Sequence, residues 1–298
     1  MVALLLIGVE RFCFRQTAGF RESKILSSLP SDPRWALPIL SVEKRKEIQA
    51  LLDQPYSYIG HGGTCYCFES KDKKNILKFL KHQHMNPVHW SEKIPLPEAL
   101  VPLRQKHVLA WKEKLAHKQP EFLFTSFLIA YQELKEETGL IHIQINKDDP
   151  FTQEVTLYDK IGAKHSISLK DTEFVLQKKA ELLFPHLGAL TKTHATEEIK
   201  QSIHSIIALL LKRYEKGISD RDPNLLINFG FIEGTAIEID IGSFTKREKD
   251  PTHFLQDLYT DTEQLKGWLE KNSPSLTDYL DQEIQRQTSY AKKTPPSV

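Results

Sequence analysis

Three aspartates and one asparagine follow the most regular apolar stretch of the chain. Asp220 and Asp222 lie in a short loop, Asn228 ends that loop, and Asp240 lies twelve residues beyond Asn228. Phosphoryl transfer requires a carboxylate beside the attacking hydroxyl group. It also requires carboxylate and amide oxygens that hold Mg²⁺ against the phosphates. These residue types at this spacing therefore predict a site for phosphoryl transfer.

A glycine-rich turn, Gly60-His61-Gly62-Gly63, lies between two β-rich runs. Glycine lets a backbone approach phosphate oxygens closely and point N–H groups at them. The Gly-Lys-Ser/Thr ending of a Walker A loop is absent, and a strand with Tyr66 and Phe68 follows where a dinucleotide fingerprint needs a helix. A glycine turn between two strands is the arrangement that covers the ATP phosphates in protein kinases. A plain glycine hairpin without a ligand is the alternative.

Lys78 lies within an apolar stretch, 75–80, that predicts a third strand. A lysine in such a strand must either extend to solvent or meet a negative partner. It follows Gly63 by fifteen residues, which suits the lysine that pairs with phosphates after the glycine loop of a kinase. The alternatives are an edge-strand lysine without a ligand, and Lys81 at the frayed end of the same strand.

In a kinase, a glutamate from the following helix holds that lysine. We select Glu133, because Phe127, Ala130 and Leu134 lie near its face of the predicted helix and would turn it inward. A solvated surface acid is the alternative for each glutamate of this stretch. The four glutamates available are Glu121, Glu133, Glu136 and Glu137.

The elements that must position these residues follow from the hydrophobic periodicity. The clearest is a helix over 196–216, with Thr196 as its predicted N-cap and Gly217 as its predicted C-cap. Strands with one intervening helix come first and helices with one hairpin follow, which predicts an α+β fold with two lobes. Further helices are predicted over 42–53, 97–117, 121–138, 252–271 and 275–291, an extended segment over 14–41, and strands over 56–70, 75–80, 140–145, 154–158, 165–169, 174–177 and in the hairpin that ends at 237–240.

Two motifs resemble the protein-kinase-like superfamily. The run Asp220-Arg-Asp-Pro-Asn224-Leu-Leu-Ile resembles the catalytic loop Asp-Arg-His-x-x-Asn-Leu-Leu-Ile of phosphoinositide 3-/4-kinases, and Ile239-Asp-Ile-Gly242 is similar to their Ile-Asp-Phe-Gly. The order from the glycine turn through Lys78 to Asp240 is also similar to kinase-like proteins of chlamydia-type bacteria. The resemblance covers about 56–245, in motif order rather than in continuous identity.

The resemblance implies a two-lobed kinase-like fold with a reduced C-lobe and an N-terminal extension. It divides the chain into an extension (1–55), an N-lobe-like region of strands plus one helix (56–180) and a helical C-lobe-like region (181–298). The implied cofactors are ATP and Mg²⁺. The implied catalytic residues are Asp222, Asp220 and Lys78; the nucleotide-binding residues are Gly60, Gly62, Gly63, Lys78 and Glu133; the metal-binding residues are Asn228 and Asp240.

This chain departs from the family pattern in its spacing. The catalytic Asp and the metal-binding Asn of kinases are about five residues apart. Here Asp220 and Asn224 are four apart, and Asp222 and Asn228 are six apart. Asn228 precedes Asp240 by twelve residues, closer to the roughly 13–14 of kinases than the sixteen from Asn224, so we select Asp222 with Asn228.

These departures leave three functions open. The first is an atypical phosphotransferase that moves the ATP γ-phosphoryl group to a hydroxyl acceptor, which is a protein, a lipid or a small molecule. The second is a pseudokinase that binds nucleotide without turnover. The third is an interaction or effector protein whose acidic loop is only a turn. Only 56 residues follow Gly242, and none forms an Ala-Pro-Glu segment, which argues against the substrate docking of ordinary protein kinases.

Composition narrows the partners and the compartment. Forty basic and thirty-nine acidic residues give a net charge of +1, which argues against nucleic acid as a partner. The apolar run 2–9 is too short to cross a bilayer, so it predicts a buried strand, with a short membrane anchor as the alternative. Three cysteines without metal-ligand spacing predict free thiols in a reducing compartment. With the resemblance to proteins of chlamydia-type bacteria, this implies a cytoplasmic protein, either of a bacterium or secreted into a host cytosol.

Two further groups of reactive side chains have simpler explanations. The histidines His82, His84 and His89 lie beside a basic loop without a carboxylate or thiol companion, so we expect them on a solvated surface rather than on a metal. Cys65 and Cys67 lie on one face of a strand, which favours a structural pair over a nucleophile.

Overall fold

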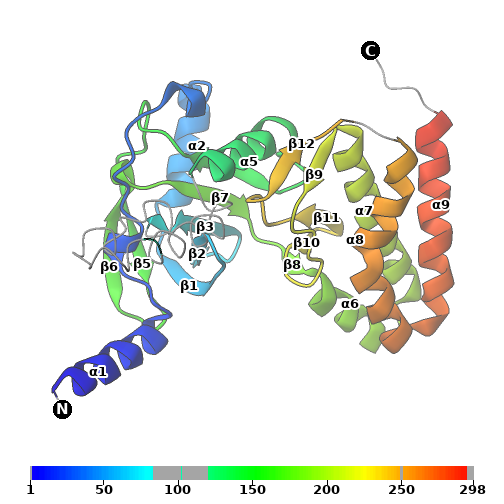
Figure 1. Cartoon of the computed structure of the whole chain (residues 1–298), viewed down its shortest axis with the longest axis horizontal. Coiled ribbons are helices and arrows are strands. Elements are labelled where there is room, and N and C mark those ends of the chain that lie inside the picture. Colours follow the sequence, from blue (N-terminus) through cyan, green and yellow to red (C-terminus); the bar gives the residue numbers. More distant parts are fainter. Residues whose placement is uncertain (1, 83–101, 103–119, 249–250, 294–298) are drawn as a thin grey trace. The chain divides into compact units, whose positions relative to one another are not determined.

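The computed structural model describes residues 2–82, 102, 120–248 and 251–293 (Figure 1). Its mixture of helices and sheets confirms the α+β class expected from the sequence. The chain divides into two compact units, described one at a time below: Met1–Thr125 with Ile141–Gln177, and Ser126–Leu140 with Lys178–Val298. The helix predicted over 97–117 and the C-terminal tail beyond 293 lie outside the described residues.

A seven-stranded sheet in the order β4-β7-β3-β2-β1-β5-β6 is the framework of the first unit (Figure 1). β1, β2 and β3 form an antiparallel meander, β5 pairs parallel to β1, and β6 pairs antiparallel to β5. The strands predicted from the sequence are therefore present. Their bounds are β1 (Tyr56–His61), β2 (Cys65–Ser70), β3 (Asn75–Leu80), β4 (Leu140–Gln144), β5 (Glu154–Tyr158), β6 (Lys164–Ser168) and β7 (Phe174–Lys178).

Aromatic side chains fill the core of this unit. The Phe20 ring meets the rings of Tyr66 and Phe68 edge-on, with centroids 5.3 and 5.2 Å apart, and Phe68 meets Phe79 in the same way. Edge-to-face contacts of this kind stabilise a core beyond the area that they bury. The core thus fixes the register of β2 against β3, because both strands supply its side chains.

Helix α2 (Val42–Leu52) confirms the helix predicted over 42–53. The Ser41 side chain caps its N-terminus by accepting a hydrogen bond from the Lys44 N–H, and Ile48 and Leu52 are buried. Short 3₁₀ helices interrupt the loops of the same unit: η1 (Glu22–Lys24), η2 (Pro33–Trp35) and η6 (Leu169–Asp171).

The strand predicted near the N-terminus is wrong, because residues 2–17 form helix α1 (Val2–Thr17). Alanine and leucine, which dominate its first turns, are strong helix formers, and no run of β-branched residues opposes them. The helix ends where Ala18 and Gly19 take positive φ angles of 52° and 72°. Val9 and Phe12 on this helix are 53% and 63% exposed. Within the described residues, the helices are all too short or too polar to span a bilayer.

The second unit is mainly helical and contains two small sheets, β11-β10-β8 and β12-β9 (Figure 1). Helix α5 begins in the first unit and continues into the second. The bounds are α5 (Pro120–Glu133), β8 (Glu181–Leu182), α6 (Leu183–Lys192), α7 (Thr196–Glu215), β9 (Ile218–Asp220), β10 (Phe229–Ile232), β11 (Thr235–Glu238), β12 (Phe244–Lys246), α8 (Pro251–Asn272), η7 (Pro274–Leu276) and α9 (Thr277–Lys293).

Helix α7 is the centre of this unit and confirms the helix predicted over 196–216. Its buried face, which includes Ile203, Ile206 and Leu210, packs in one core with side chains of α6, α8 and α9. Gly217 ends the helix at φ 65°, as predicted. Thr196 is not the N-cap, because the turn at His194 (φ 55°) makes Ala195 the cap without a side-chain hydrogen bond.

Two helix predictions need correction. Helix α5 ends at Glu133 rather than near 138, and turns continue to Gly139 (φ 60°). Beyond this end, the Glu137 carboxylate forms ion pairs with Lys212 and Lys216 of α7, at 2.5 and 2.9 Å. These long-range contacts favour the turns over a continued helix, and the local sequence does not show them. Helix α6 escaped prediction because Pro185 and a glycine interrupt its sequence, although proline is tolerated in the first turn.

The core around α7 predicts a clear difference between two substitutions. Leu210→Ala removes a side chain with no exposed surface, so the free energy of unfolding should fall by about 2–5 kcal/mol. Ile161→Ala at an exposed turn should change it by less than about 0.5 kcal/mol. Urea unfolding of both variants checks the difference, and equal losses would contradict the assignment of this core.

Candidate functional site

The two-stranded sheet β9-β12 positions Asp220. Asp220 ends β9 opposite Phe244 of β12, and its Oδ1 accepts hydrogen bonds from the Ser243 hydroxyl and, at 3.0 Å, from the Asp222 N–H. The Arg221 N–H donates to the Ser243 carbonyl at 3.2 Å. Asp220 is 8% exposed, so it fixes the start of the acidic loop rather than facing solvent.

Asp222 lies on the exposed side of the same loop, near Asp220 and Asp240. Partial burial of its carboxyl group raises the pKa of Asp222, and the negative charges of Asp220 and Asp240 raise it further, while a hydrogen bond from Asn228 opposes both. Asp220 and Asp240 thus both act electrostatically on Asp222. A carboxylate with a raised pKa accepts a proton more readily than an ordinary aspartate, which suits a general base.

Asn228 and Asn224 have different positions in the loop. The Asn228 side chain is 4% exposed, and its Nδ2 donates to the Asp222 carbonyl at 2.9 Å. The Asn228 carbonyl accepts from the Ile239 N–H at 2.7 Å, which joins the end of the loop to the segment that carries Asp240. The Asn224 side chain instead accepts from the Leu226 N–H at 3.0 Å and closes a turn. The Asn224 N–H also donates to the Asp222 carbonyl, at 2.7 Å. Asn228 differs from Asn224 in that its side chain contacts Asp222 and its backbone is joined to the segment that carries Asp240.

A tight turn after β11 holds Asp240. Its Oδ1 accepts from the Gly242 N–H at 3.0 Å. The Ser126 hydroxyl of α5 donates to the Ile241 carbonyl at 2.6 Å and accepts from the Phe244 N–H at 2.7 Å. Ser126 is fully buried, so it connects α5 firmly to the residues on both sides of Gly242. Nothing in the sequence distinguished Ser126 or Ser243 from other serines, because their role depends on contacts between distant segments.

Behind the acidic loop lies a buried charge network centred on Arg213 of α7. Its Nη1 donates to Glu238 of β11 at 2.6 Å and its Nη2 to Asp261 of α8 at 2.7 Å, and the Tyr214 hydroxyl also donates to Asp261 at 2.6 Å. Complete burial raises the pKa of Glu238 well above its ordinary value, despite Arg213, and the nearby Asp220 raises it further. Glu238 lies two residues before Asp240, so this network anchors the strand that presents Asp240.

The candidate metal ligands are few. Among residues 2–82, 120–248 and 251–293, no group of three or more His, Cys, Asp and Glu side chains is arranged to hold a metal ion. Mg²⁺ commonly binds one or two carboxylates together with waters and substrate phosphates, rather than an all-protein cage. Asp240 and Asn228 are residue types that such a site uses, and their role as metal ligands stays a prediction.

The glycine turn lies in the first unit, between β1 and β2. A bulge between Tyr58 and Gly60 interrupts the β1–β2 register, and the Gly62 N–H donates to the Cys65 carbonyl at 3.0 Å. A Cβ added at Gly60 or Gly62 would meet no atom within 4 Å, and neither residue has a left-handed φ. Within the part of the chain that the structure describes, the fold therefore gives no steric or conformational reason for glycine at these two positions.

Lys78 is half-buried in β3, opposite Cys67 of β2. Glu133 belongs to the second unit and forms an ion pair with Lys246 of β12. The predicted pairing of Lys78 with Glu133 joins residues of different units and stays a prediction.

The prediction for His82 is wrong. His82 is 8% exposed, and its Nε2 lies 2.5 Å from the Glu173 carboxylate. Glu173, just before β7, also accepts from the Ser27 hydroxyl at 2.5 Å. The pair forms because β3 and β7 are neighbours in the sheet, which the local sequence does not show. His84 and His89 lie outside the described residues.

The free cysteines agree with the sequence: Cys13, Cys65 and Cys67 form no disulfide.

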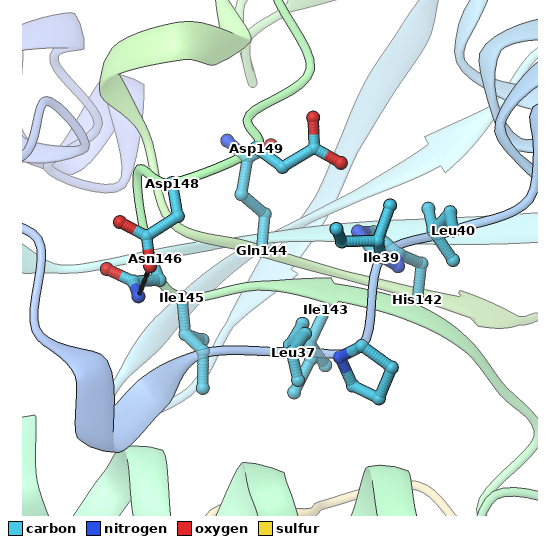
Figure 2. Close-up of a pocket in the computed structure, with 11 residues that line it drawn as sticks. Leu37, Ile39, Leu40, His142, Ile143, Gln144, Ile145, Asn146, Asp148 and Asp149 are labelled. Carbon is cyan, nitrogen blue, oxygen red and sulfur yellow. Dashed lines mark hydrogen bonds between the residues drawn. The ribbon is translucent and has the colours of Figure 1, made fainter.

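A shallow pocket of the first unit lies between the segment Leu37–Leu40 and residues 142–149, which include the end of β4 (Figure 2). The space within it that a water molecule can occupy is about 50 Å³, the pocket is partly open to solvent, and its lining is largely apolar. Asp148 and Asp149 at its rim are already bonded to Ser31 and Arg45. None of the site residues predicted from the sequence lines this pocket.

Comparisons with known proteins give only distant matches. No protein-family model and no curated protein matches the chain. A 2.2 Å crystal structure of WbdD matches with 15% identity and a TM-score of 0.33, over 68% of this chain and 35% of WbdD. A co-crystal structure of WbdD with the kinase inhibitor LY294002 matches with 13% identity and a TM-score of 0.36, over 80% and 50% of the two chains.

A complex of Rv3197 with erythromycin, from Mycobacterium tuberculosis, matches with 14% identity and a TM-score of 0.35, over 79% and 60% of the two chains. The chain thus spans 35–60% of the length of these three structures. We take no residue role from matches at these TM-scores. The mixed α+β architecture is consistent with a kinase-like fold. The comparisons give no link to chlamydia-type bacteria, so that part of the resemblance stays a prediction.

The crowding of carboxylates around Asp222 predicts a pH-dependent gain in stability for Asp222→Asn. The pKa of Asp222 is raised in the folded protein, so the folded state binds this proton more tightly than the unfolded state. The stability that follows is complete below about pH 4, the unfolded pKa, and is lost as pH rises through the folded pKa. The neutral amide escapes this loss, so Asp222→Asn should be more stable than wild type at pH 7, by about 0.5 kcal/mol given solvent screening.

Thermal melts at pH 7 and at pH 3.5, in low salt, test this sign. The advantage of the variant should shrink at the lower pH. A variant that is less stable than wild type at pH 7 would show that the Asp222 carboxylate supports the fold instead of being strained by its neighbours.

Proposed function

We propose that this chain is an atypical kinase-like phosphotransferase that moves the γ-phosphoryl group of ATP to a hydroxyl acceptor. One observation carries the proposal: a single unit brings Asp222, Asn228 and Asp240 together, from the two ends of a loop and the end of the following hairpin. These are the residue types and the order that phosphoryl transfer uses.

Each residue of the acidic loop suits one task. Asp222 is exposed and has a raised pKa, so it is the candidate to orient or deprotonate the acceptor hydroxyl. Asp220 is bonded to Ser243 and to the loop backbone, so we assign it the task of holding the loop, with the base role as its alternative. Asp240 and Asn228 would hold Mg²⁺, which neutralises charge on the phosphates when bound.

The first unit would supply the phosphate contacts. A Cβ added at Gly60 or Gly62 would meet no atom of the described residues within 4 Å, and Lys78 lies on β3, the strand that carries the phosphate-pairing lysine in kinases. Glu133 as the partner of Lys78 belongs to the same proposal. The proposal places no requirement on the acceptor, which is a protein, a lipid or a small molecule.

A pseudokinase is the second candidate. The observation that favours it is the loop itself, in which Asp222 and Asn228 are six residues apart and the Asn228 amide is engaged by the Asp222 carbonyl. An interaction protein without a nucleotide is the third. A cytoplasmic location and a membrane contact through residues 2–9 are further proposals that this site does not decide.

Two isosteric variants separate these candidates. Asp222→Asn should keep the affinity for Mg·ATP and lose turnover by about 10²–10⁴-fold, because a base acts on the attacking hydroxyl and not on ATP. Asp240→Asn should lose the Mg²⁺-dependent part of ATP binding, because an amide replaces a carboxylate at a hard cation. Asp220→Asn shows which aspartate is the base. Calorimetric titration and an ATP-consumption assay measure both effects.

Asp278→Asn, on the exposed surface of α9, is the matched control and should change neither quantity. Binding of Mg·ATP without consumption in the wild type would favour the pseudokinase. Unaltered Mg²⁺-dependent ATP binding in Asp240→Asn would rule out the metal site. A wild-type protein that does not bind Mg·ATP at millimolar concentration would favour the interaction protein without a nucleotide.

A further inference from the structure

Lys81 holds the glycine turn through two hydrogen bonds. It follows β3 directly, its Nζ donates to the Gly62 carbonyl at 2.7 Å, and its backbone N–H donates to the Thr64 carbonyl at 2.8 Å. The residue is 6% exposed, and its Nζ lies 4.5 Å from the centre of the Tyr66 ring. A buried ammonium group that donates to a loop carbonyl restricts the conformations of that loop.

These bonds decide which backbone groups of the turn are engaged. The carbonyls of Gly62 and Thr64 bond to Lys81, and the Cys65 carbonyl accepts from the Gly62 N–H at 3.0 Å. Among the described residues, the N–H groups of Gly63 and Thr64 have no hydrogen-bond acceptor. Successive N–H groups that are not engaged within the protein form a concave site for an anion. A phosphate oxygen fits this site, whereas an unengaged carbonyl would repel it.

The electrostatic field at the turn has the sign that an anion requires. Partial burial lowers the pKa of His61, and the positive charges of Lys81 and Lys160 lower it further. Lys160 acts on His61 only through its charge: its Nζ donates to the Arg15 carbonyl at 3.3 Å, and among the described residues it makes no hydrogen bond to the turn. Two lysines thus contribute positive potential at the turn, but only Lys81 shapes its backbone.

We propose that Lys81 is the positioning residue that fixes the glycine turn with the Gly63 and Thr64 N–H groups presented to a nucleotide phosphate. The inference rests on the proposed function, since it concerns the phosphate contacts of that same site. It adds a residue distinct from Lys78: Lys78 would pair with the phosphate directly, while Lys81 acts through the backbone. Removal of Lys81 should therefore weaken the contact with phosphate and not the contact with the base or sugar.

The test compares Lys81→Met with Lys160→Met. The first removes the donor and keeps most of the apolar stem, and the second removes a nearby positive charge without a bond to the turn. Calorimetry with ATP, adenosine and inorganic tripolyphosphate gives three affinities for each variant. Lys81→Met should bind ATP and tripolyphosphate about tenfold more weakly with unchanged affinity for adenosine, because the Gly63 and Thr64 N–H groups would no longer be held in position for phosphate.

Lys160→Met should show a smaller loss that disappears at high salt. Lys81→Arg restores a donor of similar reach and should recover part of the affinity for phosphate. If Lys81→Met does not fold, Lys81→Gln against Lys81→Arg gives the same comparison. A merely structural role would weaken ATP and adenosine together and would overturn the inference.

Two further outcomes are distinguishable. An unchanged ratio of ATP to adenosine affinity in Lys81→Met overturns the inference and leaves the proposed function standing. Wild type that binds neither ATP nor tripolyphosphate overturns the proposed function itself.

Discussion

The buried guanidinium group of Arg213 is the constraint on which the acidic loop depends. It is 1% exposed and is paired with Glu238 of β11 and Asp261 of α8. When one partner of a buried ion pair is lost, the other charge remains buried, at a typical cost of about 3–5 kcal/mol. Helix α7, helix α8 and β11 are therefore held in one arrangement by a single side chain. This arrangement also fixes the position of Asp240, because Asp240 follows β11 after one intervening residue.

The same region collects more negative charge than Arg213 neutralises. Burial raises the pKa of Glu238 and of Asp261, and Asp220 adds to both effects. Asp222 experiences Asp220 and Asp240 in the same way. Carboxylates that lie close to one another repel and so destabilise the folded protein. Perturbed pKa values of this kind cluster at functional sites, where a cation or a reacting group interacts with the carboxylates. The repulsion among these carboxylates therefore lowers the stability of this unit and also raises the pKa of Asp222, the proposed base.

In the first unit, the polar glycine turn Gly60–Gly63 lies at the end of strands that pack on an apolar core. The β1–β2–β3 meander has an aromatic core beneath it, so its register is set by Phe68 and Phe79 rather than by the turn. Lys81 then reaches the turn from the end of β3, and the backbone around Gly62 takes one shape without help from glycine's left-handed conformations. Among the described residues, no atom lies within 4 Å of a Cβ added at Gly60 or Gly62.

The sequence by itself determined the elements with strong periodicity. The apolar spacing of α7, the alternation in β1 to β7 and the glycine at 217 each depend on local geometry, so they could be predicted from neighbouring residues. The α+β class and the candidates Asp222, Asn228 and Asp240 followed from residue types and their order. Local reasoning failed at the cap of α7 and at the end of α5, where a turn or a distant ion pair decides the boundary. It also failed at α1, where strong helix formers outweighed the expected strand.

Tertiary structure decided which of these candidates meet. The Asn228 side chain contacts Asp222 while its carbonyl pairs with Ile239 on the next segment, and the Asn224 side chain closes a turn with Leu226. Nothing in the sequence distinguished Ser126, Ser243 and Glu238, because their partners lie 23 to 118 positions away. Lys81 was named only as an alternative to Lys78, and its bond to Gly62 spans 19 positions. The buried pair of His82 and Glu173 escaped for the same reason. Hydrophobic periodicity depends on residues that are neighbours along the chain, so the sequence shows it directly. A site depends on residues that are neighbours in space, and these come together only when strands and helices pack.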